Sequence, residues 1–142
     1  MPNQPDTLAL TPDANAVTLA AQWLEGIAER EGWSPKATFG LTLSLDEALT
    51  NIVSYAFRRA PADGAAPAVT LACRHDGGRI LLDVADNGEP YDPTQAELPD
   101  LAASLDDADI GGHGTRLMRH YLQELVYARD GDWNRLTMAV QA

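Results

Sequence analysis

The sequence lacks the features that mark several classes of protein. Its single cysteine, Cys73, excludes an intramolecular disulfide framework and a metal site built from clustered cysteines. No run of ~18 apolar residues is present to span a bilayer, and residues 1–20 lack the basic start and apolar stretch of a signal peptide. We therefore expect a soluble cytoplasmic protein that makes no membrane contact.

Basic residues are also scarce. The 142 residues include 10 Lys and Arg against 21 Asp and Glu, so the formal net charge is −11. Direct binding to nucleic acid needs a basic surface, and this charge argues against it. A nucleotide is still compatible with the charge, because backbone N–H groups and a metal ion can hold its phosphates.

Length and apolar content suit one globular domain over residues 1–142. Apolar residues make up 45 % of the chain, which is ordinary for a folded domain. A chain of this length buries enough surface to fold without disulfides or zinc. No internal repeat or long linker divides it.

The hydrophobic patterns predict an α+β fold. Strands are expected over 6–11, 68–75, 79–86, 124–129 and 134–140, and helices over 12–30, 35–57 and 115–122. Thr11-Pro12 and Ser34-Pro35 are typical helix starts, and Asp76-Gly77-Gly78 is typical of a hairpin turn. Strands joined by tight turns favour a mixed, mostly antiparallel sheet, covered on one face by three helices in a two-layer sandwich.

Two polar segments stand out, one on a predicted helix and one at the end of a predicted strand. Glu47 and Asn51 are four residues apart on the second helix, so they share one face. They are either a solvated stripe or a carboxylate and an amide that face a cleft, where their oxygens suit Mg²⁺ and the carboxylate suits a general base. Asp86-Asn87-Gly88 ends a strand, either as a plain turn or as a site where Asp86 accepts a hydrogen bond from a ligand and Gly88 lets the backbone come close.

A third segment combines glycines with a helix start. Gly111, Gly112 and Gly114 come directly before Thr115 and the predicted third helix. Outward-facing N–H groups at such a helix start suit a phosphate, whereas the alternative is a flexible hinge. No lysine follows the glycines as in a Walker loop.

These segments, in this order, resemble the nucleotide-binding boxes of the GHKL (Bergerat-fold) superfamily, and more narrowly those of bacterial anti-sigma-factor serine/threonine kinases. The resemblance runs from about residue 8 to residue 140. The matching segments are Glu47-x-x-x-Asn51, Asp86-x-Gly88 with Tyr91-Asp92-Pro93, Gly111-Gly112-x-Gly114, and a closing hairpin of Tyr127-x-Arg129-Asp130-Gly131 and Asn134-Arg135-Leu136-Thr137.

The resemblance implies a role for each matching residue. It makes Glu47 the base that takes a proton from a serine or threonine hydroxyl, and Asn51 the ligand of the Mg²⁺ that bridges the phosphates of ATP. It assigns the adenine amino group to Asp86, with Thr137 in support, and gives Gly88 the role of making room for the base. It places the phosphates on Gly111, Gly112, Gly114 and Thr115, under an ATP lid over about 94–110.

The resemblance also implies partners. A kinase of this kind binds a sigma factor in one state and phosphorylates a STAS-type anti-anti-sigma protein in another, and two copies form a homodimer. The alternative is a non-catalytic module that acts by sequestering a partner, with or without nucleotide. A histidine kinase domain fits less well, because such domains usually carry Asn at the position of Glu47 and follow a phosphoacceptor histidine, and no histidine precedes residue 75. Gyrase-like and Hsp90-like ATPases share the Glu and Asn but need further domains.

Overall fold

The computed structural model of the chain describes residues 4–61, 64–95 and 118–142. It has a sheet of five strands with the order β1-β2-β3-β5-β4. The strands are β1 (Asp6–Leu10), β2 (Val69–Asp76), β3 (Arg79–Asp86), β4 (Glu124–Asp130) and β5 (Trp133–Gln141). The helical elements are α1 (Ala16–Glu31), α2 (Pro35–Asn51), the π-helical turn η1 (Ile52–Ala56) and the 3₁₀ turn η2 (Pro93–Gln95), and residues 118–121 are also helical.

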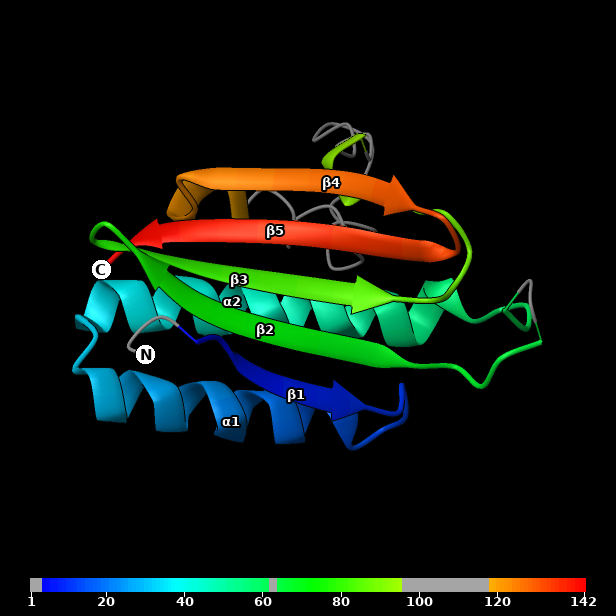
Figure 1. The fold of residues 1–142 in the computed structure, drawn as a ribbon, viewed down its shortest axis with the longest axis horizontal. Helices are drawn as coiled ribbons and strands as arrows, with labels where there is room; N and C mark the ends of the chain where they lie inside the picture. The colour runs from blue at the N-terminus through cyan, green and yellow to red at the C-terminus, as the bar shows by residue number, and fades with distance from the viewer. Residues whose placement is uncertain (1–3, 62–63, 96–117) are drawn as a thin grey trace, which may run out of the picture.

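Helices and sheet form two layers, with α1 and α2 side by side against one face of the sheet (Figure 1). Every strand pair among the described residues is antiparallel, so the expectation of a mixed sheet is wrong in that detail. The pairing of β3 with β5 places Asp86 opposite Asn134. All five predicted strands are present within two residues of their expected bounds.

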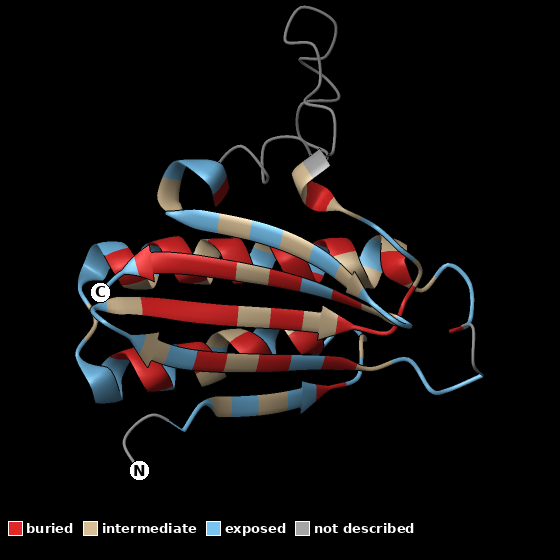
Figure 2. Ribbon diagram, turned by 45° about the horizontal axis from the view of Figure 1, so that its top comes forward, coloured by how far each residue is buried: buried red, intermediate tan, exposed pale blue. Residues whose placement is uncertain are grey.

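Alternation along the strands builds the core. Inward residues of the central strands β3 and β5 are buried, while the edge strands β1 and β4 are more exposed (Figure 2). The buried strand residues pack against the apolar stripes of α1 and α2, where Leu24, Leu41 and Leu45 are almost fully buried. Among the described residues no helix is long and apolar enough to cross a bilayer.

The two helix starts differ in outcome. Ser34 caps α2 as predicted, since its Oγ accepts a hydrogen bond of 3.1 Å from the backbone N–H of Ala37. Thr11 does not cap α1, which begins at Ala16. The Asp13 carboxylate accepts a 2.9 Å hydrogen bond from the N–H of Asn15, and this local turn competes with helix formation over residues 12–15.

Candidate active site

A cavity lies where the C-terminal end of α2 meets the ends of β3 and β5. Its walls come from α2, η1, β3, β4, β5, residues 91–93 and residue 118, and most of the side chains that line it are apolar. Two of its polar lining residues are Asn51 on α2 and Asp86 on β3. The structure thus brings together two residues that lie 35 positions apart and were predicted separately as candidate ligand contacts.

Asp86 is a buried carboxylate, only 4 % exposed. Its Oδ1 accepts hydrogen bonds from the backbone N–H of Gly88 at 2.9 Å and from Asn134 Nδ2 at 3.0 Å. Burial raises the pKa of Asp86, and these two hydrogen bonds together with the charge of Arg129 oppose the rise. No described residue donates to Oδ2, which leaves this oxygen as an acceptor for a ligand donor in the cavity.

Asn134 holds this end of the cavity together. Besides its bond to Asp86, its Nδ2 donates to the carbonyl of Glu89 at 2.8 Å. Its Oδ1 accepts from the Tyr127 hydroxyl and, at 3.4 Å, from the N–H of Tyr91. The side chain therefore joins β3, β4, β5 and the segment after β3, although the sequence analysis gave it no role. A signal was present, since Asn134 is a polar residue in an inward series otherwise made of Leu136, Met138 and Val140.

Gly88 is required by packing of the backbone. A Cβ at this position would lie 2.4 Å from the carbonyl oxygen of Ala56, the last residue of η1. The same carbonyl accepts a 2.9 Å hydrogen bond from the N–H of Glu89. The structure shows close contact of Gly88 with η1, and its role of making room for a base stays a prediction. This contact fixes the end of α2 against the segment that follows Asp86.

Glu47 and Asn51 share one face of α2, as their spacing predicts. Burial raises the pKa of the half-buried Glu47 carboxyl; hydrogen bonding by Asn51 opposes this rise, and the charge of Asp46 adds to it. Asn51 is buried and lines the cavity. Its amide oxygen is an acceptor that can contact a ligand or a cation there.

Thr137 is placed away from the cavity. It faces Asp83 across the β3–β5 pair, and its hydroxyl donates to Asp83 Oδ1 at 2.6 Å. Leu136 lines the cavity. Because successive side chains of a strand point to opposite faces, its neighbour Thr137 lies on the face of the sheet away from the cavity. The expectation that Thr137 supports Asp86 is therefore wrong, and Asn134 does so instead.

The remaining predicted contacts lie outside the described residues. They are Gly111, Gly112, Gly114, Thr115 and the part of the lid over 96–110. At the start of the lid, Asp92 Oδ1 accepts hydrogen bonds from the N–H and the hydroxyl of Thr94, and Arg119 donates to the carbonyl of Thr94. The bond from Arg119 connects the two sides of the segment that carries the glycines.

Comparisons with known proteins agree with this geometry. Residues 10–140 match the family described as the histidine kinase-like ATPase domain. Over 138 residues, 97 % of this chain and 94 % of the relative, the sequence is 50 % identical to the serine/threonine-protein kinase BtrW of Bordetella bronchiseptica.

A crystal structure of the RsbU and RsbW domains of a Mycobacterium tuberculosis protein is also similar, with a TM-score of 0.68 and 14 % identity. The match covers 97 % of this chain, which spans about a third (32 %) of that longer chain. The likeness at this identity concerns the fold alone, and it confirms the expected α+β sandwich of the Bergerat type.

Proposed function

The chain belongs to the histidine kinase-like ATPase domain family, and from that premise we propose that it is a serine/threonine-protein kinase that transfers a phosphoryl group from ATP to a partner protein. The observation that carries the proposal is the placement of Asn51 and Asp86 in the walls of one cavity. An amide oxygen and a carboxylate oxygen without a described donor are suitable contacts for the two ends of a nucleotide.

Asp86 and the apolar walls are proposed to bind adenine. A purine amino group is a hydrogen-bond donor, and Asp86 Oδ2 is the acceptor placed to receive it. Asn134 and Gly88 hold the other oxygen, so the carboxylate is positioned before the ligand binds. A flat aromatic base suits the mostly apolar side chains, two of them tyrosines, that line the rest of the cavity.

Glu47 and Asn51 are proposed to serve the phosphates and the acceptor hydroxyl. Their hard oxygen atoms fit Mg²⁺, which takes one or two ligands from protein and the others from water and phosphate. The described residues contain no cluster of three or more His, Cys, Asp or Glu side chains that could hold a metal by themselves. When bound, Mg²⁺ supplies positive charge against the phosphates. The raised pKa of Glu47 makes its carboxylate a stronger base toward a serine or threonine proton.

We further propose that the phosphoacceptor is a STAS-type anti-anti-sigma protein and that the kinase sequesters a sigma factor, as the sequence resemblance implies. The same resemblance supports a homodimer and phosphate contacts from Gly111, Gly112, Gly114 and Thr115. None of these partners is needed for the nucleotide site, so the site is tested separately.

Calorimetric titration with ATP and ADP, each with and without Mg²⁺, tests the site. We expect binding that depends on Mg²⁺ and is lost in Asn51→Ala, while Thr50→Ala, an exposed change one residue earlier on α2, binds as the wild type does. Radiolabelled ATP is then incubated with each STAS-domain protein encoded in the same genome, and a labelled acceptor confirms the kinase. Absence of binding at millimolar nucleotide would overturn the proposal and leave a module that acts by partner contact alone.

A further inference from the structure

We propose that Arg58 and Arg59, beside the Tyr55–Tyr91 pair, form a docking surface for an acidic segment of the phosphoacceptor protein. We call these four residues the Arg-Tyr surface. The inference rests on the proposed kinase function for the identity of the partner, but the surface itself follows from the contacts described below.

The two arginines are placed where their charges face solvent. They follow η1 after Phe57, and both are exposed. Neither has a carboxylate within ion-pair distance among the described residues. By contrast, Arg30 pairs with Asp6 at 2.6 Å and Arg79 with Glu124 at 3.0 Å. In a chain with a net charge of −11, two adjacent arginines that form no ion pair with a described carboxylate are notable.

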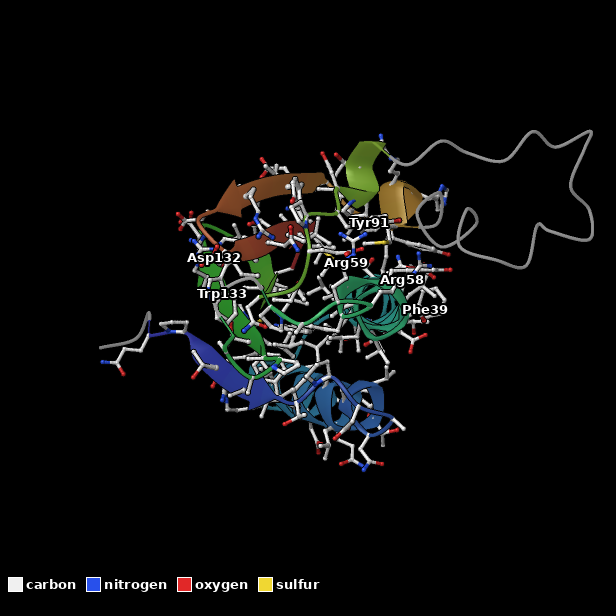
Figure 3. The ribbon with its side chains drawn as sticks, turned by 90° about the vertical axis from the view of Figure 1, so that its right-hand side faces the viewer. Phe39, Arg58, Arg59, Tyr91, Asp132 and Trp133 are labelled. Atoms are coloured by element: carbon white, nitrogen blue, oxygen red, sulfur yellow. The ribbon has the colours of Figure 1, made fainter. Side chains whose placement is uncertain are left out.

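Aromatic contacts connect the arginines to the cavity. The guanidinium carbon of Arg58 lies 4.7 Å from the centroid of the Tyr55 ring, a contact that restrains the side chain while its N–H donors have no described acceptor. The Tyr55 ring lies 6.4 Å from that of Tyr91, at an interplanar angle of 31°. Tyr91 lines the cavity, so the surface begins at the wall of the candidate active site. In the view of Figure 3, the labels of Arg58, Arg59 and Tyr91 fall in the same region of the outline.

The charge distribution indicates what binds there. The net negative charge of the chain repels an acidic partner over most of the surface. The arginine pair attracts it locally, and this contrast orients its approach. Arginine binds carboxylates through paired N–H groups, and a protein segment with Asp or Glu near its target hydroxyl supplies them. Neither arginine lines the cavity, which favours a protein segment over the nucleotide as the ligand.

Three other described basic residues, Lys36, Arg74 and Arg135, also lack a described hydrogen-bond or ion-pair partner, but none of them lines the cavity. Arg74 is exposed on β2 next to the inward-facing, buried Cys73, so it points to the sheet face away from the helices. It provides a matched control with the same change of charge away from the Arg-Tyr surface.

Peptide binding tests the surface independently of catalysis. Two fluorescent peptides carry a central serine flanked either by glutamates or by glutamines, and anisotropy is measured at low salt. We expect the glutamate peptide to bind wild type more tightly, by about tenfold, which is the effect of two exposed ion pairs. Arg58→Glu/Arg59→Glu and the milder Arg58→Gln/Arg59→Gln should lose this preference, whereas Arg74→Glu should keep it. Equal binding of the two peptides to wild type, or loss of the preference in Arg74→Glu, would overturn the inference.

Kinetics then separate the surface from the nucleotide site. With the acceptor identified by radiolabelling, the double variants should raise KM for the acceptor about tenfold and leave the Kd for ATP unchanged. Weaker ATP binding instead would assign the arginines to the nucleotide and overturn the docking proposal. If no acceptor is labelled but the peptide preference depends on the arginines, the kinase function fails and the acidic-segment surface stands.

Discussion

Asn134 donates a 3.0 Å hydrogen bond to Asp86 across the β3–β5 pair, and both residues are buried. The same side chain also contacts Glu89, Tyr91 and Tyr127. One amide on the closing hairpin therefore sets the position of the carboxylate proposed to bind adenine. It also anchors the segment that leads from β3 into the lid.

Replacement of Asn134 should affect both stability and nucleotide binding. We expect Asn134→Ala to lower the free energy of unfolding by about 2–4 kcal/mol, because it leaves buried partners without their hydrogen bonds. ATP affinity should fall about tenfold, the equivalent of one well-placed hydrogen bond. Urea unfolding and calorimetry measure the two effects. Asn87→Ala is the control, since the buried Asn87 side chain hydrogen-bonds to the backbone of Ala66 and Ala68 instead. An equal loss of ATP affinity in this variant would contradict the role assigned to Asn134.

Replacement of glycine by alanine should change the free energy of unfolding in opposite directions at Gly88 and Gly26. Gly88→Ala places a Cβ 2.4 Å from the Ala56 carbonyl oxygen, so we expect a loss of about 1–3 kcal/mol in the free energy of unfolding. Gly26→Ala meets no atom within 4 Å in the middle of α1 and should stabilise by about 0.5–1 kcal/mol. Thermal and urea unfolding decide the sign. Destabilisation by both substitutions would refute the packing argument for Gly88.

Local sequence patterns were sufficient to predict the helices and strands and part of the candidate site. Glu47 and Asn51 could be paired from their spacing because an α-helix repeats every 3.6 residues, and Asp86 could be placed because its strand ends in a turn sequence. The start of α1 was misplaced because the Asp13 turn competes with a helix signal at Thr11.

Long-range register explains what the sequence analysis missed. Thr137 was assigned to Asp86 from a motif, but whether it faces the cavity depends on the pairing of β3 with β5. A shift of one residue in register exchanges the faces of a strand, and no local signal fixes it. The contact of Gly88 with Ala56 is also long-range, since Ala56 lies 32 residues earlier in the chain and no local signal predicts it.

Glu47 should be needed for phosphoryl transfer and not for binding. We expect Glu47→Gln to bind ATP with little change and to lower the rate of phosphorylation by ~10²-fold or more, because it removes the proposed general base. Asp46→Asn alters an exposed neighbouring carboxylate and should retain most activity. Since burial raises the pKa of Glu47 above its ordinary 4.5, activity should decline on acidification at a higher pH than for an exposed glutamate. A rate in Glu47→Gln equal to wild type would exclude the base role.

The buried thiol provides a probe of unfolding. Cys73 is 1 % exposed, and burial raises its pKa to about 12. A thiol in this state is protonated at pH ~8 and unreactive, so we expect iodoacetamide to label the native chain only at the rate at which it opens. Labelling should become complete in urea, and saturating ATP should slow it in the native state. Rapid labelling of the native protein, followed by mass spectrometry, would contradict the placement of Cys73.

The burial of Asp86, which the proposed function requires, should lower the stability of the fold. Its pKa is raised in the folded state above the ordinary 3.8 of the unfolded chain. At a pH between the unfolded and the folded pKa, the folded chain binds more protons than the unfolded chain, so stability falls as the pH rises. Asp86→Asn removes this effect and keeps an oxygen for the Gly88 and Asn134 donors. We expect it to raise the free energy of unfolding at pH ~7 by about 0.5–1 kcal/mol while abolishing adenine-dependent binding. The gain should shrink on acidification and vanish below the unfolded pKa, where wild-type Asp86 is protonated in both states. A gain that is independent of pH, measured by urea unfolding across this range, would show that ionisation of Asp86 is not its cause.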